Sequence, residues 1–502
     1  MSIEPSSSVF EPRYGAGEAQ CLAIRLVADL ETPVSAYLKM KALAAGGPSF
    51  LLESVEGGAV RGRYSIIGLK PDLTWRCKSD AIEISRDGKV ETLTGKPLDS
   101  LRALLAESRI PHLAGLPPMA SGVFGFLGYD MVRHMERLPA AKADPIGVPD
   151  ALMIRPTLLV VFDAVKDELV VITPVFPKTG VSAKAAYEAA SDRLNAAVAA
   201  LDTPLAYAGD AADLDARLPT TVSNTTPDEY KAMVAAAKEY ILAGDIFQVV
   251  LSQRFSTPFD LDAFSLYRAL RRVNPSPYLC YLDFSEFQIV CSSPEILVKV
   301  VDGKVTIRPI AGTRPRGATL AEDKRLEEEL LADPKERAEH LMLLDLGRND
   351  VGRVSEIGSV SVTDSYFVER YSQVMHIVSN VEGRIDAKYD VIDALSAGFP
   401  AGTVSGAPKI RAMEIIDELE KDKRGAYAGA IGYFGADGAM DTCIVLRTAV
   451  VKDGVMHVQA GAGIVHDSNP ASEQAECENK AKALFRAAEE AVRFASRGKR
   501  GQ

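Results

Sequence analysis

Residues 158–173 read LLVVFDAVKDELVVIT, two runs of β-forming residues with a polar turn between them. Branched and aromatic side chains favour strands because they pack well on a pleated surface. Similar short runs recur at 49–53, 62–68 and 82–85. The strands come in clusters and do not alternate strictly with helices. This pattern favours an α+β fold with large antiparallel sheets over a doubly wound parallel sheet.

One segment, 203–226, reads as a linker between two domains. It follows an Ala-rich helical stretch at 183–200 and is rich in Pro, Gly, Thr and Asn. Thr226-Pro227-Asp228-Glu229 then has the form of a capping box, with Pro at the first helical position. Further helices are expected near 227–242, 334–346, 407–421 and 470–495. We predict an N-terminal domain over 1–202, the linker over 203–226, a second domain over 227–495 and a basic tail over 496–502.

Composition and charge exclude several classes of protein. The chain has 502 residues, 47% of them hydrophobic and 25% charged, which is typical of a soluble globular protein of two or more domains. No apolar run approaches the roughly 20 residues that span a bilayer, and residues 1–13 show no signal pattern, so a cytoplasmic location and no membrane association are expected. The net charge of -11 argues against nucleic-acid binding. An anionic substrate would therefore need specific arginines or a metal to hold it.

The cysteines show no pattern of a metal site or a disulfide framework. Six are scattered along the chain without a Cys-x-x-Cys pair or a Cys/His cluster. We expect reduced thiols that mainly pack in the core.

Two pairs of glutamates lie at the starts of predicted helices. Glu336 and Glu339 are three residues apart, as are Glu473 and Glu476, so each pair lies on one helix face. Two such pairs facing each other would make an oxygen-rich site suited to Mg²⁺. A capping role for Glu336 and plain solvated helix faces are the alternatives.

Glycine-rich segments and isolated polar residues are further candidates. The segments 401–408 and 461–463 could present backbone N–H groups to an anion, although ordinary turns are the better explanation of either segment taken alone. Arg447 interrupts an apolar run predicted to be a buried strand, where it needs an anionic partner from protein or ligand. His376 lies in another apolar run, where a histidine is more often a satisfied core residue than a catalyst.

Taken together, these segments resemble the chorismate-utilising enzymes. The similarity covers 223–494 and, more weakly, 49–138. The matching stretches are Gly244–Gln248, Ser292–Glu295, Pro309–Gly317, Ala338–Met342, Asp345–Asp350, the 401–408 segment, Tyr427, Arg447, Gly461–Gly463 and Ser472–Glu476. The resemblance implies an α+β fold of extended sheets packed face to face with helices outside, and it implies that 227–495 binds chorismate.

The resemblance also assigns roles to single residues. It implies Mg²⁺ ligands at Glu339 and Glu476, with Glu336 and Glu473 in support. It implies that Glu295 is the general acid. It also implies that His376 and Thr403 lie near the chorismate ring, where they handle protons. The positions implied to hold substrate are Gly312, Thr313, Tyr427, Arg447, Gly461, Ala462 and Gly463.

Two missing lysines indicate which reaction of the family to expect. Members that add water carry a lysine at the position of Gln248, and members resembling aminodeoxychorismate synthase often carry a nucleophilic lysine at the position of Ala311. Because neither lysine is present, we expect ammonia to attack the chorismate ring directly and pyruvate to be eliminated. This is the anthranilate synthase pattern, a first step toward tryptophan. Chorismate amination of the aminodeoxychorismate synthase type is the alternative.

Two more expectations follow from the resemblance. Glu53 and Ser54, with Pro277, Tyr278 and Leu279, match the two halves of a tryptophan feedback site, although a strand and a Pro-rich turn would look the same. Leu279-Cys280 stands where a Met followed by an aromatic residue is usual, which puts the strength of inhibition in doubt. No glutamine-hydrolysing motif is present, so we expect a separate glutamine amidotransferase subunit, in a heterodimer or heterotetramer.

Overall fold

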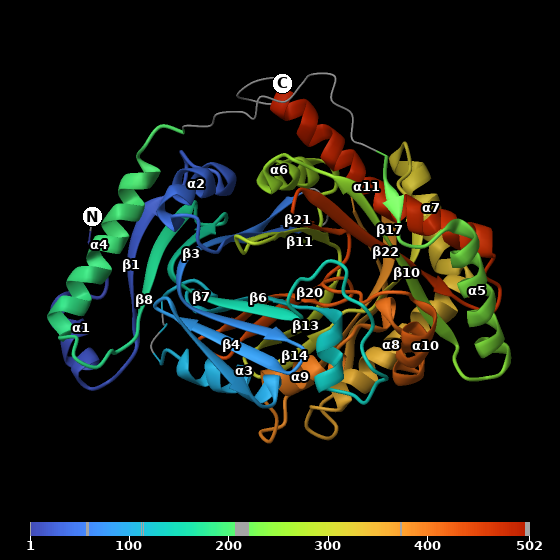
Figure 1. Cartoon of the computed structure of the whole chain (residues 1–502), viewed down its shortest axis with the longest axis horizontal. Coiled ribbons are helices and arrows are strands. Elements are labelled where there is room, and N and C mark those ends of the chain that lie inside the picture. Colours follow the sequence, from blue (N-terminus) through green and yellow to red (C-terminus); the bar gives the residue numbers. More distant parts are fainter. Residues whose placement is uncertain are drawn as a thin grey trace.

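Helices surround a large β-assembly in the computed structural model of the chain, which describes residues 2–56, 60–111, 113, 115–205, 220–371 and 374–496 (Figure 1). The helices are α1 Ser7–Gly15, α2 Pro33–Met40, α3 Pro97–Glu107, α4 Ala183–Leu201, α5 Pro227–Leu242, α6 Ala263–Val273, α7 Leu320–Ala332, α8 Pro334–Gly352, α9 Val391–Gly398, α10 Lys409–Leu419 and α11 Pro470–Ser496, with short 3₁₀ turns η1 Lys41–Ala44, η2 Tyr129–His134 and η3 Gly402–Val404. The predicted helices at 183–200, 227–242 and 470–495 are confirmed almost to the residue.

The start of α5 shows why that prediction succeeded. The Thr226 hydroxyl accepts a hydrogen bond from the Glu229 backbone N–H, and the Glu229 carboxylate accepts one from the Thr226 N–H. These bonds satisfy N–H groups that the helix itself leaves without partners.

Every ladder among the described strands is antiparallel. The strands are β1 Gln20–Val27, β2 Ser49–Glu56, β3 Val60–Lys78, β4 Ala81–Arg86, β5 Lys89–Thr94, β6 Gly122–Leu127, β7 Ala151–Asp163, β8 Glu168–Val175, β9 Val222–Ser223, β10 Gln248–Pro258, β11 Tyr278–Asp283, β12 Gln288–Ser293, β13 Ile296–Val301, β14 Lys304–Ile307, β15 Ile310–Pro315, β16 Ser361–Arg370, β17 Val374–Arg384, β18 Gly406–Ala407, β19 Ala430–Gly435, β20 Met440–Ile444, β21 Thr448–Lys452 and β22 Val455–Ile464. Strands β7 and β8, from the 158–173 stretch, pair with Val161 opposite Val170. The predicted α+β class with antiparallel sheets is confirmed.

Strands that precede the predicted linker pair directly with strands that follow it. β2 pairs with β11, with Ser54 opposite Tyr278, and β6 pairs with β19, with Leu127 opposite Ala430. The hydrogen-bonded sheet therefore runs across the boundary predicted near 203–226. Residues 206–219 of that linker and 497–502 of the basic tail lie outside the described residues.

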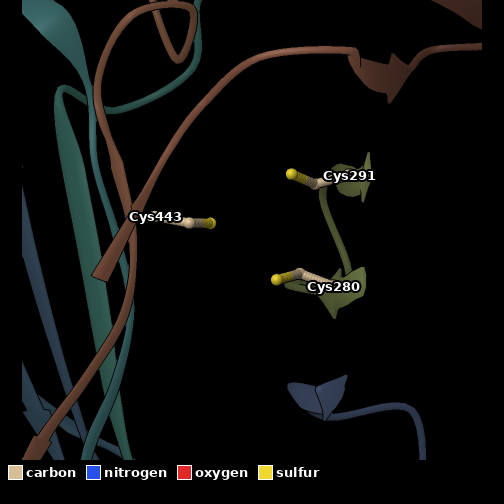
Figure 2. Close-up of side chains that lie close together, drawn as sticks. All are labelled: Cys280, Cys291 and Cys443. Atoms are coloured by element: carbon tan, nitrogen blue, oxygen red, sulfur yellow. The ribbon is translucent and has the colours of Figure 1, made fainter. Parts of the chain in front are cut away.

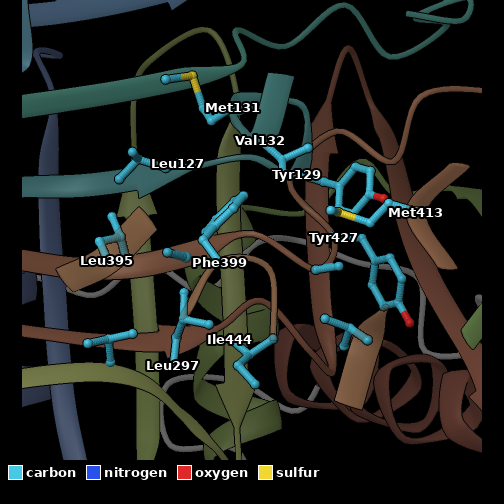
Figure 3. Close-up of a cluster of buried hydrophobic side chains, with 14 of the residues drawn as sticks. Leu127, Tyr129, Met131, Val132, Leu297, Leu395, Phe399, Met413, Tyr427 and Ile444 are labelled. Carbon is cyan, nitrogen blue, oxygen red and sulfur yellow. The ribbon is translucent and has the colours of Figure 1, made fainter. Parts of the chain in front are cut away.

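The core fills the space between facing layers of the sheet. In Figure 1 one layer contains β6, β7, β13 and β20, and the other contains β11, β21 and β22. Aromatic side chains pack between them, with Phe126 lying 5.8 Å from Phe284 and 6.0 Å from Phe287 between ring centroids. A second cluster packs the helices on the sheet and includes Leu297, Phe399 and Tyr427 (Figure 3).

All six cysteines are buried and unpaired, so their predicted place in the core is confirmed. Three of them meet, two from the neighbouring strands β11 and β12 and the third from β20, far along the chain. Figure 2 shows Cys280 and Cys291 on one side and Cys443 facing them, with the sulfur atoms within 4.8 Å of one another. Burial raises the pKa of Cys443 well above its usual value, and the trio belongs to an apolar cluster. We interpret these thiols as core packing.

Among the described residues, none of the helices combines the length and the apolar character needed to cross a bilayer.

The core between the layers predicts a stability effect. Phe126 is fully buried, so Phe126→Ala should lower the free energy of unfolding by about 3–5 kcal/mol, because it leaves a cavity that the rigid layers cannot fill. Val165, which is 72% exposed, provides the control, and Val165→Ala should change stability by less than about 0.5 kcal/mol. Denaturant unfolding of the two variants measures both effects. Equal losses would contradict this account of the core.

Candidate active site

Glu295 lies in the short break between β12 and β13, where the backbone is held in place by β20. The Ile444 N–H donates to the Glu295 carbonyl at 3.0 Å, and the Ser293 hydroxyl donates to the Ile444 carbonyl at 2.6 Å. Burial raises the pKa of the Glu295 carboxyl to about 8, and the Thr403 hydroxyl and the Arg447 charge oppose that rise. Glu295 is therefore mostly protonated at neutral pH and suited to act as a general acid.

Thr403 reaches Glu295 from the glycine-rich segment 401–408. Its hydroxyl donates to Glu295 Oε1 at 3.2 Å. The segment forms η3 and then β18, which pairs with β10, before α10 begins at Lys409. Its contribution to the site is thus a positioned hydroxyl group.

Arg447 lies outside any strand, in contrast to the prediction. β20 ends at Ile444 and β21 begins at Thr448, and Arg447 between them has a φ of +48°. Residues other than glycine adopt such left-handed backbone rarely, and often at functional sites. The run 443–451 looked like one strand because both flanking strands are apolar.

The Arg447 guanidinium has no carboxylate within salt-bridge distance in the part of the chain that the structure describes. Burial lowers its pKa from the usual value, while Tyr371 and Glu295 nearby counteract this. A guanidinium remains charged even so. Of the two partners that the sequence left open, the geometry therefore favours an anionic ligand.

His376, Gly312 and Thr313 meet where β15 pairs with β17. His376 Nδ1 lies 2.9 Å from the Gly312 carbonyl and 3.1 Å from the Thr313 hydroxyl. Because the carbonyl can only accept, Nδ1 carries the hydrogen and the lone pair is on Nε2. Burial lowers the pKa of His376 to about 4, so the ring is neutral and can accept a proton.

Gly312 is required at its position for two reasons. Its φ is +71°, and it lies at an irregularity in the β15–β17 ladder. A Cβ there would lie 3.1 Å from Glu336 Oε2 and 3.2 Å from Leu330. The backbone therefore comes close to one of the candidate metal-binding glutamates.

Gly461–Gly463 lie inside β22, and not in the loop that the sequence suggested. Across from them on β10, the Val250 N–H bonds to Ser405 and the Ser252 N–H bonds to Glu420, so both turn away from β22. Their partners in register, Gly463 and Gly461, then point their own N–H groups away from β10. The β21 ladder ends at Val458. These two N–H groups therefore line an open strand edge.

Gln248 begins β10 beside these glycines. A Cβ on Gly463 would lie 3.1 Å from Gln248 Nε2. Gln248 Oε1 is buried and has no hydrogen-bond partner among the described residues. A buried carbonyl oxygen without a donor is unusual in a folded protein and indicates a place for a ligand that carries N–H or O–H.

Tyr427 is also buried, and its hydroxyl lies 2.8 Å from where a Cβ on Gly461 would be. Ala462, between the two glycines, is fully buried. The fold thus brings Tyr427 and the edge of β22 together, although they come from separate parts of the sequence.

The four glutamates come together from α8 and α11. Burial raises the pKa of Glu339, and the charges of Glu336 and Glu476 raise it further. Burial likewise raises the pKa of Glu473, with Glu476 adding to the effect. Like charges that disturb one another in this way suit a divalent cation.

The carboxylates of these four glutamates do not form a compact set of metal ligands. Among the described residues their oxygens do not all come within 4.8 Å of one another. Arg314 holds Glu336 at 3.0 Å and Lys480 holds Glu476 at 2.7 Å. Lys480 also donates to the Gly461 carbonyl at 2.9 Å. The sequence analysis missed this lysine, and its only signal is the spacing of four residues from Glu476.

A separate cavity of about 1470 Å³ is lined by Glu53, Ser54, Pro277 and Tyr278. Leu279 points elsewhere, into the apolar core, while Cys280 lines the cavity. This follows from strand geometry, because neighbouring side chains face opposite sides. Pro294 and Ile296, the two residues on either side of Glu295, also line this cavity.

Polar groups in this cavity are already partly engaged. The Glu53 carboxylate accepts hydrogen bonds from Tyr267 at 2.6 Å and from Arg271 at 2.6 and 2.8 Å. The Tyr278 hydroxyl donates to Asp441 at 2.9 Å, and Lys299 lies 3.3 Å from the same carboxylate. Asp441 lines the cavity too, and the sequence gave no sign of it.

Comparisons with known proteins cover almost the whole chain. A family model described as a chorismate binding enzyme matches residues 48–486. Anthranilate synthase component 1 of Cereibacter sphaeroides is 54% identical over 497 residues, which are 98% of this chain and 99% of that protein. The crystal structure of anthranilate synthase component I from Streptococcus pneumoniae shares 40% identity at a TM-score of 0.74, covering 84% of this chain and 92% of that one. MenF, the menaquinone-specific isochorismate synthase from Escherichia coli, has the same fold at 19% identity and a TM-score of 0.72, covering 96% and 100%.

The raised pKa of Glu295 predicts how stability changes with pH. The carboxyl titrates near 4.5 when exposed and near 8 when buried, so the wild type loses stability as pH rises between these values. Glu295→Gln has no such proton to lose. Relative to wild type, it should gain stability on the order of a few kcal/mol between pH 5 and pH 8.5.

Denaturant unfolding at the two pH values measures the difference. Glu286→Gln is the control, because its carboxylate is largely exposed and paired with Arg76, and it should show almost no pH-dependent difference. An equally flat result for Glu295→Gln would mean that Glu295 is ionised in the folded protein.

Proposed function

The chain belongs to the chorismate-binding enzymes, and on that basis we propose that it converts chorismate and ammonia into anthranilate, pyruvate and water. The observation that carries the proposal is 54% identity, over 98% of the chain, to a protein named anthranilate synthase component 1. The side chains around Glu295 supply the chemistry that this reaction needs.

We assign substrate binding to the Arg447 guanidinium and to nearby hydroxyl and backbone N–H groups. Chorismate carries two carboxylates, and Arg447, which lacks a carboxylate partner among the described residues, pairs with one of them through its planar fork. Tyr427, the N–H groups of Gly461 and Gly463, and Gly312-Thr313 complete the pocket.

The four glutamates fit a magnesium ion that binds together with the substrate. The raised pKa values of Glu339 and Glu473, to which neighbouring carboxylates contribute, indicate repulsion among the four, and the donor set is all oxygen, as Mg²⁺ prefers. Glu339 and Glu476 would hold the ion, with Glu336 and Glu473 in support. Bound there, it would offset the charge of the second substrate carboxylate. This is the local cation that a chain of net charge -11 needs to bind an anion.

Glu295 supplies the proton that releases the 4-hydroxyl. The C–O bond breaks, the hydroxyl leaves as water, and Glu295 is left as a carboxylate that Thr403 and Arg447 stabilise. Ammonia forms the new C–N bond at the ring. We assign His376 Nε2 as the acceptor of the ring proton. As that proton leaves, the C–O bond to the enolpyruvyl group breaks and the ring becomes aromatic, and the released enolpyruvate takes up a proton to become pyruvate.

Gln248 and Ala311 support amination over the sibling reactions. Gln248 cannot take a proton from water. Its Oε1, which has no hydrogen-bond partner among the described residues, can accept an N–H of ammonia and so direct the nitrogen lone pair at the ring. Ala311 offers no nucleophile. Amination that stops before pyruvate leaves, as in an aminodeoxychorismate synthase, is the alternative.

Partner and regulation follow from the same assignment. We propose a separate glutamine amidotransferase subunit as the ammonia source, in a heterodimer or heterotetramer, since a protein called component 1 has another component. We propose tryptophan as a feedback ligand of the cavity at Glu53, Ser54, Pro277 and Tyr278, with Cys280 in the place expected for Leu279. Six unpaired cysteines support a reducing, cytoplasmic location.

Purified chain with chorismate, Mg²⁺ and ammonium should form fluorescent anthranilate and one pyruvate for each product molecule. No partner subunit is needed, because ammonium replaces glutamine. A product that keeps its pyruvyl ether would point to the alternative reaction, and no turnover at all would refute the assignment.

The magnesium assignment predicts the behaviour of two neighbouring glutamates. Glu476→Gln should lower kcat/KM at least about a hundredfold, because a lost metal ligand removes several kcal/mol of charge stabilisation. Glu478→Gln, two residues along the same helix, should remain within a few-fold of wild type. Steady-state assays over a range of Mg²⁺ concentrations compare them. Similar activity of both variants would remove Glu476 from the metal site.

A further inference from the structure

A buried ion pair lies behind the proposed substrate pocket, outside the residues assigned so far. Arg424 and Glu420 have side-chain exposures of 1% and 5%. Arg424 Nε donates to one Glu420 oxygen at 2.9 Å, and Nη2 donates to the other at 2.6 Å. Burying two charges is unfavourable unless nearly every donor and acceptor finds a partner. The remaining partners of this pair are therefore informative.

The other donors of Arg424 reach two segments that carry proposed catalytic residues. Nη1 donates to the Val404 carbonyl at 2.7 Å, next to Thr403, and Nη2 donates to the Val250 carbonyl at 2.7 Å, two residues after Gln248. One guanidinium thus links the turn that places the Thr403 hydroxyl to the strand that begins with Gln248.

Glu420 extends the network to the glycine edge. It accepts hydrogen bonds from the Ser252 N–H at 2.7 Å and the Ser252 hydroxyl at 2.8 Å. Gln459 on β22 donates to that hydroxyl at 2.8 Å. Gly461 follows two residues later on the same strand.

The Arg424 guanidinium also packs against two tyrosine rings. It lies 4.8 Å from the ring centroid of Tyr129 and 5.5 Å from that of Tyr427. Both rings belong to the core cluster of Figure 3. Tyr427 is one of the proposed substrate contacts, so the pair also reaches the part of the proposed pocket that this ring forms.

We propose that Arg424 is a positioning residue for this reaction, which aligns the Thr403 hydroxyl with Glu295 and fixes the Gln248 and Gly461 edges of the pocket. The proposal rests on the proposed function. A planar fork with five donors can reach two carbonyls and a carboxylate at once, whereas a lysine ammonium has three donors from a single point. Arg424→Lys therefore keeps the charge and removes the geometry.

The first test is the kcat of Arg424→Lys with saturating chorismate and constant free ammonia. It should fall about a hundredfold, the usual consequence of misplacing reacting groups by about 1 Å. Unchanged kcat per folded molecule would overturn the proposal.

The second test is the pH profile, which a merely structural role would leave in place. Glu295 is active when protonated, so kcat falls as pH rises through its pKa. The groups that act on Glu295 are the Thr403 hydroxyl, the Arg447 charge and Tyr371, with Asp350 across a small shared cavity. Losing the Thr403 bond raises the pKa of Glu295, so the alkaline limb should move to higher pH. Thr403→Val should move it in the same direction.

Arg155→Lys is the matched control. Arg155 is a buried arginine on β7 with a two-point pair to Asp72 at 2.9 Å for both bonds. Its further contacts are with Glu107, Ser108 and Phe176, none of which belongs to the proposed site. Its replacement should lower stability comparably while kcat and the alkaline limb stay as in wild type. A profile of Arg424→Lys that matches this control would overturn the proposal.

Two measurements keep the result interpretable. If Arg424→Lys does not fold, Glu420→Gln weakens the same pair while preserving its shape, and the same upward shift of the limb is expected. The pH dependence of unfolding reports the pKa of Glu295 without any turnover. This pKa should be higher in Arg424→Lys even if the wild type makes no anthranilate. The positioning role and the proposed reaction can therefore fail independently of each other. An unshifted unfolding profile would overturn the positioning role.

Discussion

The site depends on burying an acid and a guanidinium close together while neither forms an ion pair with the other. Burial raises the pKa of Glu295 and lowers that of Arg447. The acid responds by keeping its proton, but the guanidinium cannot lose its own. The result is a neutral proton donor beside a permanent cation that lacks a carboxylate among the described residues. Such an arrangement is poor for stability and useful for binding an anion that must be protonated.

The fold keeps this unfavourable arrangement in place. Glu295, Arg447 and Gln248 each lie at the end of a strand or in a short break between strands, where the ladders fix the backbone. Thr403 lies in the 3₁₀ turn η3, just before the short strand β18. Facing sheet layers and an aromatic core resist local collapse around them. On the opposite side, α8 and α11 bring four glutamates together. We propose that their negative charge holds a cation, which would offset the repulsion between this acidic chain and an anionic substrate.

Local patterns predicted local structure well, and they failed where distant segments meet. The capping box at Thr226 and the helical starts at Pro334 and Pro470 depend only on neighbouring residues. Gly461–Gly463 looked like a loop because the sequence does not show that β10 pairs alongside them. Arg447 looked like part of a strand because its break is a matter of backbone angles. The contacts of Arg424 with Val250 and Tyr129, and those of Cys443 with Cys280 and Cys291, join residues more than a hundred positions apart along the chain, beyond the reach of spacing rules. The division at 203–226 remains a prediction, since strands from both sides of it share one sheet.

The central claim is that Arg447 is a buried cation whose partner is the substrate. The most direct measurement is the affinity for chorismate, in Mg²⁺, of a Glu295→Gln chain that cannot turn the ligand over, with Arg447 intact or changed to Met. Removing one member of a buried charge pair usually weakens binding by 2–5 kcal/mol, so the Arg447→Met chain should bind at least about thirtyfold more weakly. Equal affinity of the two chains would contradict the account.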